Sequence, residues 1–93
     1  MSNKDQPVQP TTNLEDTMLV AFLKLKGLIA IPWISRDDKD DPRVSFDIQG
    51  DAEEIERYMF EFYNNSTVGV QDFCRQLRDV KSTLYNMKKV GRG

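Results

Sequence analysis

A group of cations and one aromatic side chain lies near the C-terminal end of this 93-residue sequence, at spacings that fit one helix face. The group consists of Arg75, Arg78, Lys81, Tyr85, Lys88 and Lys89. On a helical wheel, at about 100° per residue, Arg75, Arg78 and Lys89 share one side. Tyr85 lies on that side too, and the two other lysines flank it, where long stems reach outward. Such a face suits the phosphates of a nucleic acid, with the tyrosine stacking on an unpaired base.

The same face also has a purely structural interpretation. Any amphipathic helix has a charged outer side, and the helix dipole favours cations near the C-terminus. The charge distribution favours a function, since residues 75–93 carry +5 and residues 37–61 carry −7, while the whole chain carries −2. Opposed charges of this kind make nucleic acid or an acidic protein the candidate partners of the basic end. The sequence leaves both interpretations open.

Enzymatic chemistry is not expected from this sequence. It contains no histidine, the commonest general base and metal ligand, and its five glycines are scattered rather than gathered in a phosphate-binding loop. The acidic residues of segment 53–61 are expected on an exposed helix face, without the apolar pocket that acid–base catalysis needs. The segment DDKDDP, residues 37–42, lacks the glycine and glutamate of a calcium loop. We therefore expect no cofactor, no metal site and no small-molecule substrate.

The number of cysteines indicates the cellular compartment. Cys74 is the only cysteine, which excludes an intramolecular disulfide and suits a reducing compartment, so we expect the cytoplasm of a cell or of an infected host. Cys74 borders the apolar stripe of its helix and is expected to be a small buried hydrophobe. The nearby charges of Arg75 and Arg78 are the only argument for a reactive thiol. No apolar run has the length of a membrane span, so no membrane contact is expected.

The basic face needs a helix to hold it, and residues 70–88 have the clearest helical period in the chain. The apolar positions of this stripe are Val70, Phe73, Leu77, Val80, Leu84 and Met87. A preceding helix is expected to start at Asp51, which can cap it, and to end at the asparagines that follow Tyr63. A first helix is expected to start at Thr12 or Asn13, because Thr12 and Glu15 fit a capping box. Gly27 can end it in a left-handed conformation.

Two strands are expected at residues 28–35 and 43–49. The second alternates cleanly, and its polar link to the first is too short for a crossover, so the two should form an antiparallel hairpin. Trp33 and Phe46 are expected to face the core. The sequence thus predicts an α+β fold: a small two-layer α-β-β-α-α domain over residues 13–89, with an antiparallel β-hairpin packed on helices and open at its outer edges. Residues 1–12 and 90–93 are expected to be flexible tails.

Three stretches together resemble a family of short uncharacterised α+β proteins from bacteria, archaea, phages and mobile elements, defined as a domain of unknown function. The stretches are LVAFLKLKG, RVSFDIQGDAEEIERYMFEFYNN and VGVQDFCRQLRDVKSTLY, within about Leu14 to Tyr85. The resemblance implies an α+β domain often encoded near replication or packaging genes, and it implies no activity. It also implies that Arg78, Lys81 and Tyr85 belong to the family pattern.

We therefore expect a non-enzymatic accessory protein of a phage or mobile genetic element that binds nucleic acid through its basic C-terminal helix. The alternative is a protein–protein interaction module, either a homodimer or an inhibitor of a host factor. It would use the open strand edges, the acidic surface and Phe60, which lies away from the apolar stripe of its helix. The sequence leaves open whether Phe60 is exposed or belongs to a second small cluster.

Overall fold

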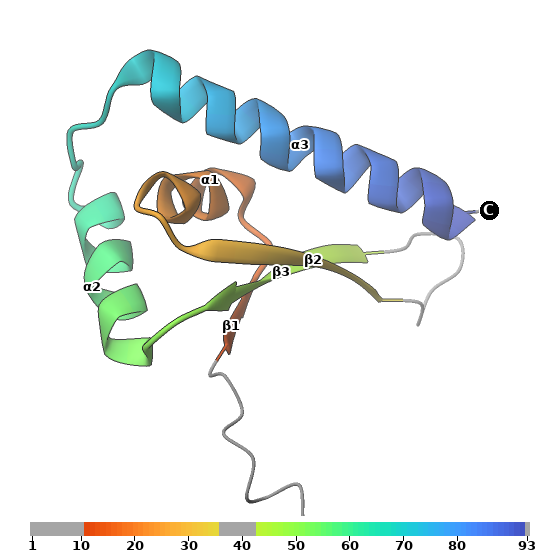
Figure 1. The fold of residues 1–93 in the computed structure, drawn as a ribbon, viewed down its shortest axis with the longest axis horizontal. Helices are drawn as coiled ribbons and strands as arrows, with labels where there is room; N and C mark the ends of the chain where they lie inside the picture. Colours follow the sequence, from red (N-terminus) through yellow and green to blue (C-terminus); the bar gives the residue numbers. More distant parts are fainter. Residues whose placement is uncertain (1–10, 36–42, 93) are drawn as a thin grey trace, which may run out of the picture.

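The structure, a computed structural model, describes residues 11–35 and 43–92. The elements are β1 (Thr11–Leu14), α1 (Thr17–Leu25), β2 (Ile29–Ser35), β3 (Arg43–Gln49), α2 (Ala52–Tyr63) and α3 (Val70–Arg92). Helices α1 and α3 lie on the same side of the sheet, and α2 stands at one end of it (Figure 1). The α+β class and the predicted hairpin are confirmed, with one additional strand before α1.

Strand β1 is the element that the sequence interpretation missed. The sheet has the order β1-β3-β2, and both neighbours of β3 are antiparallel to it. The Asn13 amide fixes the register of β1 by donating to Asp47 Oδ1 at 2.7 Å and to Ser45 Oγ at 2.9 Å. The predicted open edge of β3 is therefore wrong, because β1 of the same chain pairs with it. The edge of β2 has no partner strand among the described residues.

The start of α1 also corrects a prediction. The capping box assigned to Thr12 and Glu15 is wrong, since Thr12 lies in β1. Asp16 is the N-cap instead, and its Oδ1 accepts hydrogen bonds from the backbone N–H groups of Met18 and Leu19 at 3.0 and 3.2 Å. The predicted N-terminal tail 1–12 thus contributes its last two residues to the sheet, and residues 1–10 lie outside the described residues.

The predicted ends of the helices agree better with the structure. Asp51 caps α2, and its Oδ2 accepts from the Glu54 N–H at 3.3 Å. The predicted stops at Gly27 and at the asparagines are both confirmed: Gly27 follows α1 with a φ of +96°, and Asn65 follows α2 with a φ of 63°, each in a left-handed conformation. Helix α3 runs to Arg92, beyond the expected end at Lys88 and into the predicted C-terminal tail. The acidic link 36–42 lies outside the described residues.

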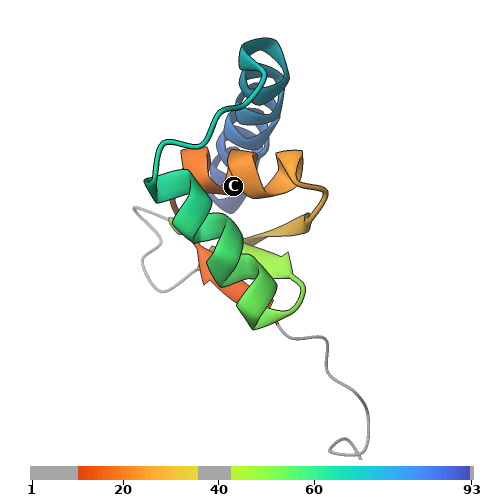
Figure 2. The same ribbon diagram turned by 90° about the vertical axis from the view of Figure 1, so that its left-hand side faces the viewer.

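Helix α1 forms the centre of the hydrophobic core. Five consecutive residues of α1 are buried, which is typical of a helix covered on several sides. Figure 2 shows α1 between α3 and the sheet, with α2 beside it. The buried apolar residues are Leu19, Val20, Ala21, Phe22, Leu23, Val44, Phe46, Ile48, Ile55 and Val80. Because α3 packs on α1, β2 and β3, this core fixes the position of the basic helix.

Trp33 does not face the core as predicted, whereas Phe46 does. Phe46 is 2% exposed and Trp33 is 59% exposed. The register explains this difference, because Trp33 pairs with Ser45 and so points to the side of the sheet opposite to the helices. Ile29 and Ile31 point the same way and are exposed as well. These three side chains form an apolar strip along β2, which we call the outer strip.

Candidate nucleic-acid interface

Helix α3 lies along the surface of the domain and carries all the predicted site residues. It has 23 residues and is about 35 Å long. Val80 is its one buried residue among those with described side chains, and Phe73, Leu77, Leu84 and Met87 pack against the core while half-buried. A narrow apolar strip therefore holds α3 on the domain, and most of its circumference faces solvent.

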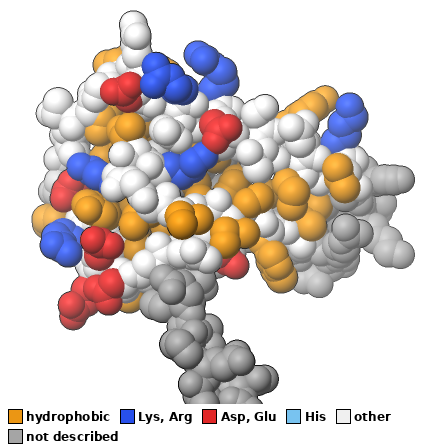
Figure 3. Space-filling model, in the orientation of Figure 1, with side chains coloured by type: hydrophobic (Ala, Val, Ile, Leu, Met, Phe, Trp, Pro, Cys, Tyr) orange, Lys and Arg blue, Asp and Glu red, His pale blue; other side chains and the backbone are white. Residues whose placement is uncertain are grey.

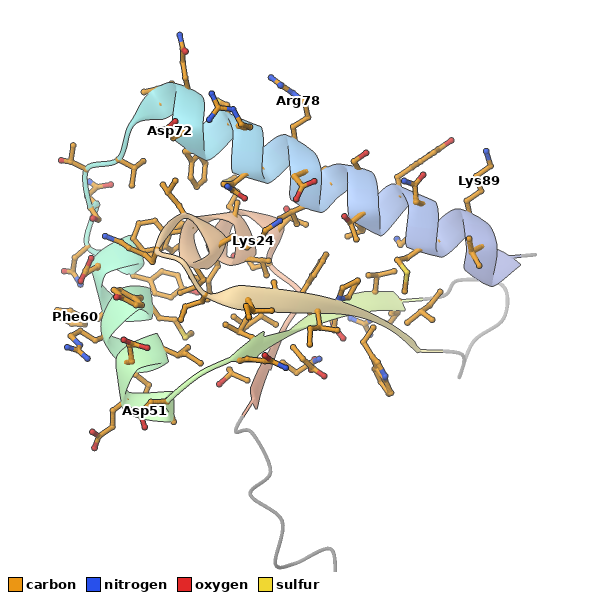
Figure 4. The ribbon with its side chains drawn as sticks, in the orientation of Figure 1. Lys24, Asp51, Phe60, Asp72, Arg78 and Lys89 are labelled. Atoms are coloured by element: carbon orange, nitrogen blue, oxygen red, sulfur yellow. The ribbon has the colours of Figure 1, made fainter. Side chains whose placement is uncertain are left out.

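The predicted site residues project from the solvent side of α3. Arg75, Arg78, Lys81, Tyr85 and Lys89 are exposed, and Lys88 is half-buried. Figure 4 shows Arg78 and Lys89 pointing away from the body of the domain. The axial distance between these two residues is about 16 Å, at 1.5 Å per residue. The structure thus brings the predicted residues together on one helix. We call the surface that they form the basic face, and its residues are Arg75, Arg78, Lys81, Tyr85, Lys88 and Lys89.

Arg75 differs from the other cations because it has a carboxylate partner. Its Nη1 lies 3.2 Å from Asp72 Oδ1, one turn earlier on the helix, and both side chains are largely exposed. An exposed pair of this kind contributes about 0.2–1 kcal/mol, so a phosphate can compete with it. Within residues 11–35 and 43–92, no carboxylate lies within 4.0 Å of the charged groups of Arg78, Lys81, Lys88 or Lys89.

An ion pair between α1 and α3 neutralises Asp79, the acidic residue next to Arg78 on α3. Lys24 donates to Asp79 Oδ2 across 55 positions of sequence. Asp79 immediately follows Arg78, so an unpaired carboxylate there would repel a phosphate on the basic face. The sequence interpretation did not include this contact, since it depends on how α1 and α3 cross. Lys24 lies in the last turn of α1, below α3 in Figure 4.

An open hollow of about 520 Å³ lies on the basic face. Its lining residues are Cys74, Leu77, Arg78, Lys81, Ser82 and Tyr85. The surface of the hollow is mainly apolar, and Arg78 and Lys81 bring positive charge to it. Cys74 was expected to be buried and is exposed. It lies beside the apolar strip of α3 rather than within it, and the underlying core does not reach that side.

Acidic side chains lie on α2, away from the basic face. Glu53 and Glu56 are exposed, and Glu61 pairs with Lys26 of α1 at 3.3 Å. Figure 3 shows a group of acidic side chains at the lower left of the molecule, where α2 stands, and cations together with acidic side chains along the upper edge, where α3 lies. The described residues contain no group of three histidine, cysteine, aspartate or glutamate side chains that could hold a metal ion.

No described helix combines the length and the apolar character that a membrane span requires. Comparison of the chain with family models, with curated proteins and with solved structures found no match. The family resemblance given above therefore stays a prediction.

Proposed function

We propose that this chain is a non-enzymatic accessory protein that binds nucleic acid through the basic face of α3. One observation carries the proposal: Arg78, Lys81 and Lys89 are exposed on one side of one helix, with no ion-pair partner within the described residues. Cations without partners keep their full attraction for an external anion. The expected setting, a phage or mobile genetic element, rests on the resemblance alone.

The spacing of these cations matches a strand of phosphates. One strand of B-form DNA presents a phosphate about every 3.4 Å of its axis, so the roughly 16 Å between Arg78 and Lys89 spans several phosphates. Each exposed cation can therefore reach a phosphate of its own. The face is not densely charged, and the chain as a whole is acidic, with a net charge of −2. We expect weak, non-specific binding, with a Kd of about 10⁻⁶ to 10⁻⁴ M at physiological salt.

Fluorescence anisotropy with labelled single-stranded and duplex oligonucleotides tests this proposal. Binding is expected at low salt, and the logarithm of the affinity should fall linearly with the logarithm of the salt concentration. Three or four neutralised phosphates give a slope of about −3 to −4 on a duplex and about −2 to −3 on a single strand. Absence of binding at about 100 μM protein in low salt, or an affinity that does not change with salt, would contradict the proposal.

The outer strip favours a second candidate function, a protein-interaction module. Ile29, Ile31 and Trp33 expose apolar surface together, and Phe60 of α2, whose placement the sequence left open, is 70% exposed. Contiguous apolar surface of this kind often marks a contact with another protein. Light scattering at increasing protein concentration separates the two candidates. Self-association that Trp33→Ser removes, without any affinity for oligonucleotides, would support the interaction module instead.

A further inference from the structure

The hollow on α3 has a different chemistry from the cations around it. Leu77 and the Tyr85 ring give it an apolar surface, and Tyr85 is 67% exposed. Phosphates alone gain nothing from such a surface, because they are strongly hydrated anions that bind cations and hydrogen-bond donors. An exposed aromatic ring does provide a stacking platform for a nucleic-acid base, since every base has a π-face.

The bases of an intact duplex cannot stack on Tyr85. Within a duplex each base is paired and stacked between its neighbours, and a protein ring stacks on a base that is unpaired or flipped out. Helix α3 packs on α1, β2 and β3 through its apolar strip, and Tyr85 lies on its exposed side. A duplex that stays paired could therefore use the cations of the basic face but not the Tyr85 ring, whereas a single strand could use both.

The positions of the cations relative to Tyr85 fit a single strand. Lys81 lies four residues before Tyr85 and Lys89 four residues after it, so each lies one helical turn away on the same face. Arg78 lies about one turn before Lys81 and also lines the hollow. A base that stacks on the tyrosine ring would thus have a cation on both sides for the two phosphates that flank its nucleotide.

We propose that the ligand of the basic face is single-stranded nucleic acid, with one base stacked on Tyr85 over the hollow and the flanking phosphates bound by Arg78, Lys81 and Lys89. This inference rests on the proposed function and names the form of nucleic acid that the face binds. Stacking and phosphate contacts do not read the 2′-hydroxyl, so single-stranded DNA and RNA should both bind.

The test measures anisotropy for a twelve-nucleotide thymidine oligomer, the matching uridine oligomer and a duplex of equal length at one low salt concentration. The wild-type chain should bind either single strand at least about fivefold more tightly than the duplex. Tyr85→Ala should lower the affinity for the single strands at least about fivefold, the loss expected when about 1 kcal/mol of stacking is removed. Tyr85→Phe keeps the ring and should bind within about twofold of wild type.

Phe60→Ala is the matched control, because it removes an aromatic ring of similar exposure from α2. It should leave the affinity for every oligonucleotide unchanged. Equal affinity for single strand and duplex, with Tyr85→Ala like wild type, would overturn the inference and leave the proposed function standing. Absence of binding to all three oligonucleotides would overturn both. A thermal melt of each variant shows whether a lost affinity reflects lost folding, and both rings are too exposed for their removal to unfold the domain.

Discussion

The double substitution Arg78→Glu and Lys81→Glu is expected to abolish measurable nucleic-acid binding. Both side chains are exposed and line the hollow on α3. A charge-assisted contact to a phosphate contributes about 1.5–3 kcal/mol, so the loss of two such contacts lowers the affinity at least about 100-fold. The introduced carboxylates also repel the phosphate backbone. Anisotropy titration at low salt measures this loss, and circular dichroism should show an unchanged fold because neither cation is buried.

Two single substitutions separate the local contribution of the basic face from the effect of the net charge of the chain. Arg78→Glu and Arg57→Glu change the charge of the chain by the same amount, but Arg57 lies exposed on α2, away from the basic face. Arg78→Glu should lower the affinity at least about tenfold, whereas Arg57→Glu should change it less than about threefold, through long-range electrostatics alone. Equal losses in the two variants would show that net charge rather than the basic face governs binding.

Phe22→Ala is expected to have the largest effect on stability. Phe22 is 2% exposed at the centre of α1, and its ring packs on that of Phe62 with centroids 5.4 Å apart. Removal of a buried phenylalanine ring costs about 3–5 kcal/mol. A domain of this size is stable by only about 5 kcal/mol, so the variant should be close to unfolding at 25 °C. Urea denaturation followed by circular dichroism measures the difference.

Met18→Ala is the control for this prediction, since Met18 lies on the same helix and is 52% exposed. It should change the free energy of unfolding by less than about 1 kcal/mol. Similar losses in the two variants would contradict the position of α1 at the centre of the core. A large loss confined to Phe22→Ala would agree with it.

Local patterns in the sequence predicted most of the fold. The alternation of Val44, Phe46 and Ile48 predicted β3, and the caps of α2 followed from Asp51 and the asparagines. Strand β1 could not be predicted in this way, because it has only four residues and is held by pairing with a strand more than 30 positions later. Thr12 and Glu15 had the spacing of a capping box, and the long-range pairing of Thr12 with Ile48 overrode that local signal.

The direction of Trp33 could not be predicted, because β2 is apolar on both sides. Ile29 and Ile31 alternate with Ala30, Pro32 and Ile34, so no polar residue marks the solvent side. A strand with two apolar sides is usually buried on both, but here no described element covers the outer strip. Whether another element covers a strand depends on the whole domain, and the pattern of one strand does not contain that information.

The candidate site was predicted in its position and less well in its details. The helical period of residues 70–88 placed the cations on the solvent side of α3, as the structure shows. The Arg75–Asp72 pair was readable from its spacing of three residues. The Lys24–Asp79 pair was not, because it depends on the crossing of two helices. Cys74 is exposed because the core covers only a narrow strip of α3, and a helical wheel gives the direction of that strip but not its width.

The most direct test of the account is to map the bound nucleic acid on the chain by NMR. Amide chemical shifts of ¹⁵N-labelled protein would be followed while a single-stranded oligonucleotide is added at low salt. We expect the largest shifts at Cys74, Arg78, Lys81, Tyr85 and Lys89, on one side of α3. Shifts concentrated on the outer strip of β2 or on α2, with α3 unchanged, would contradict it.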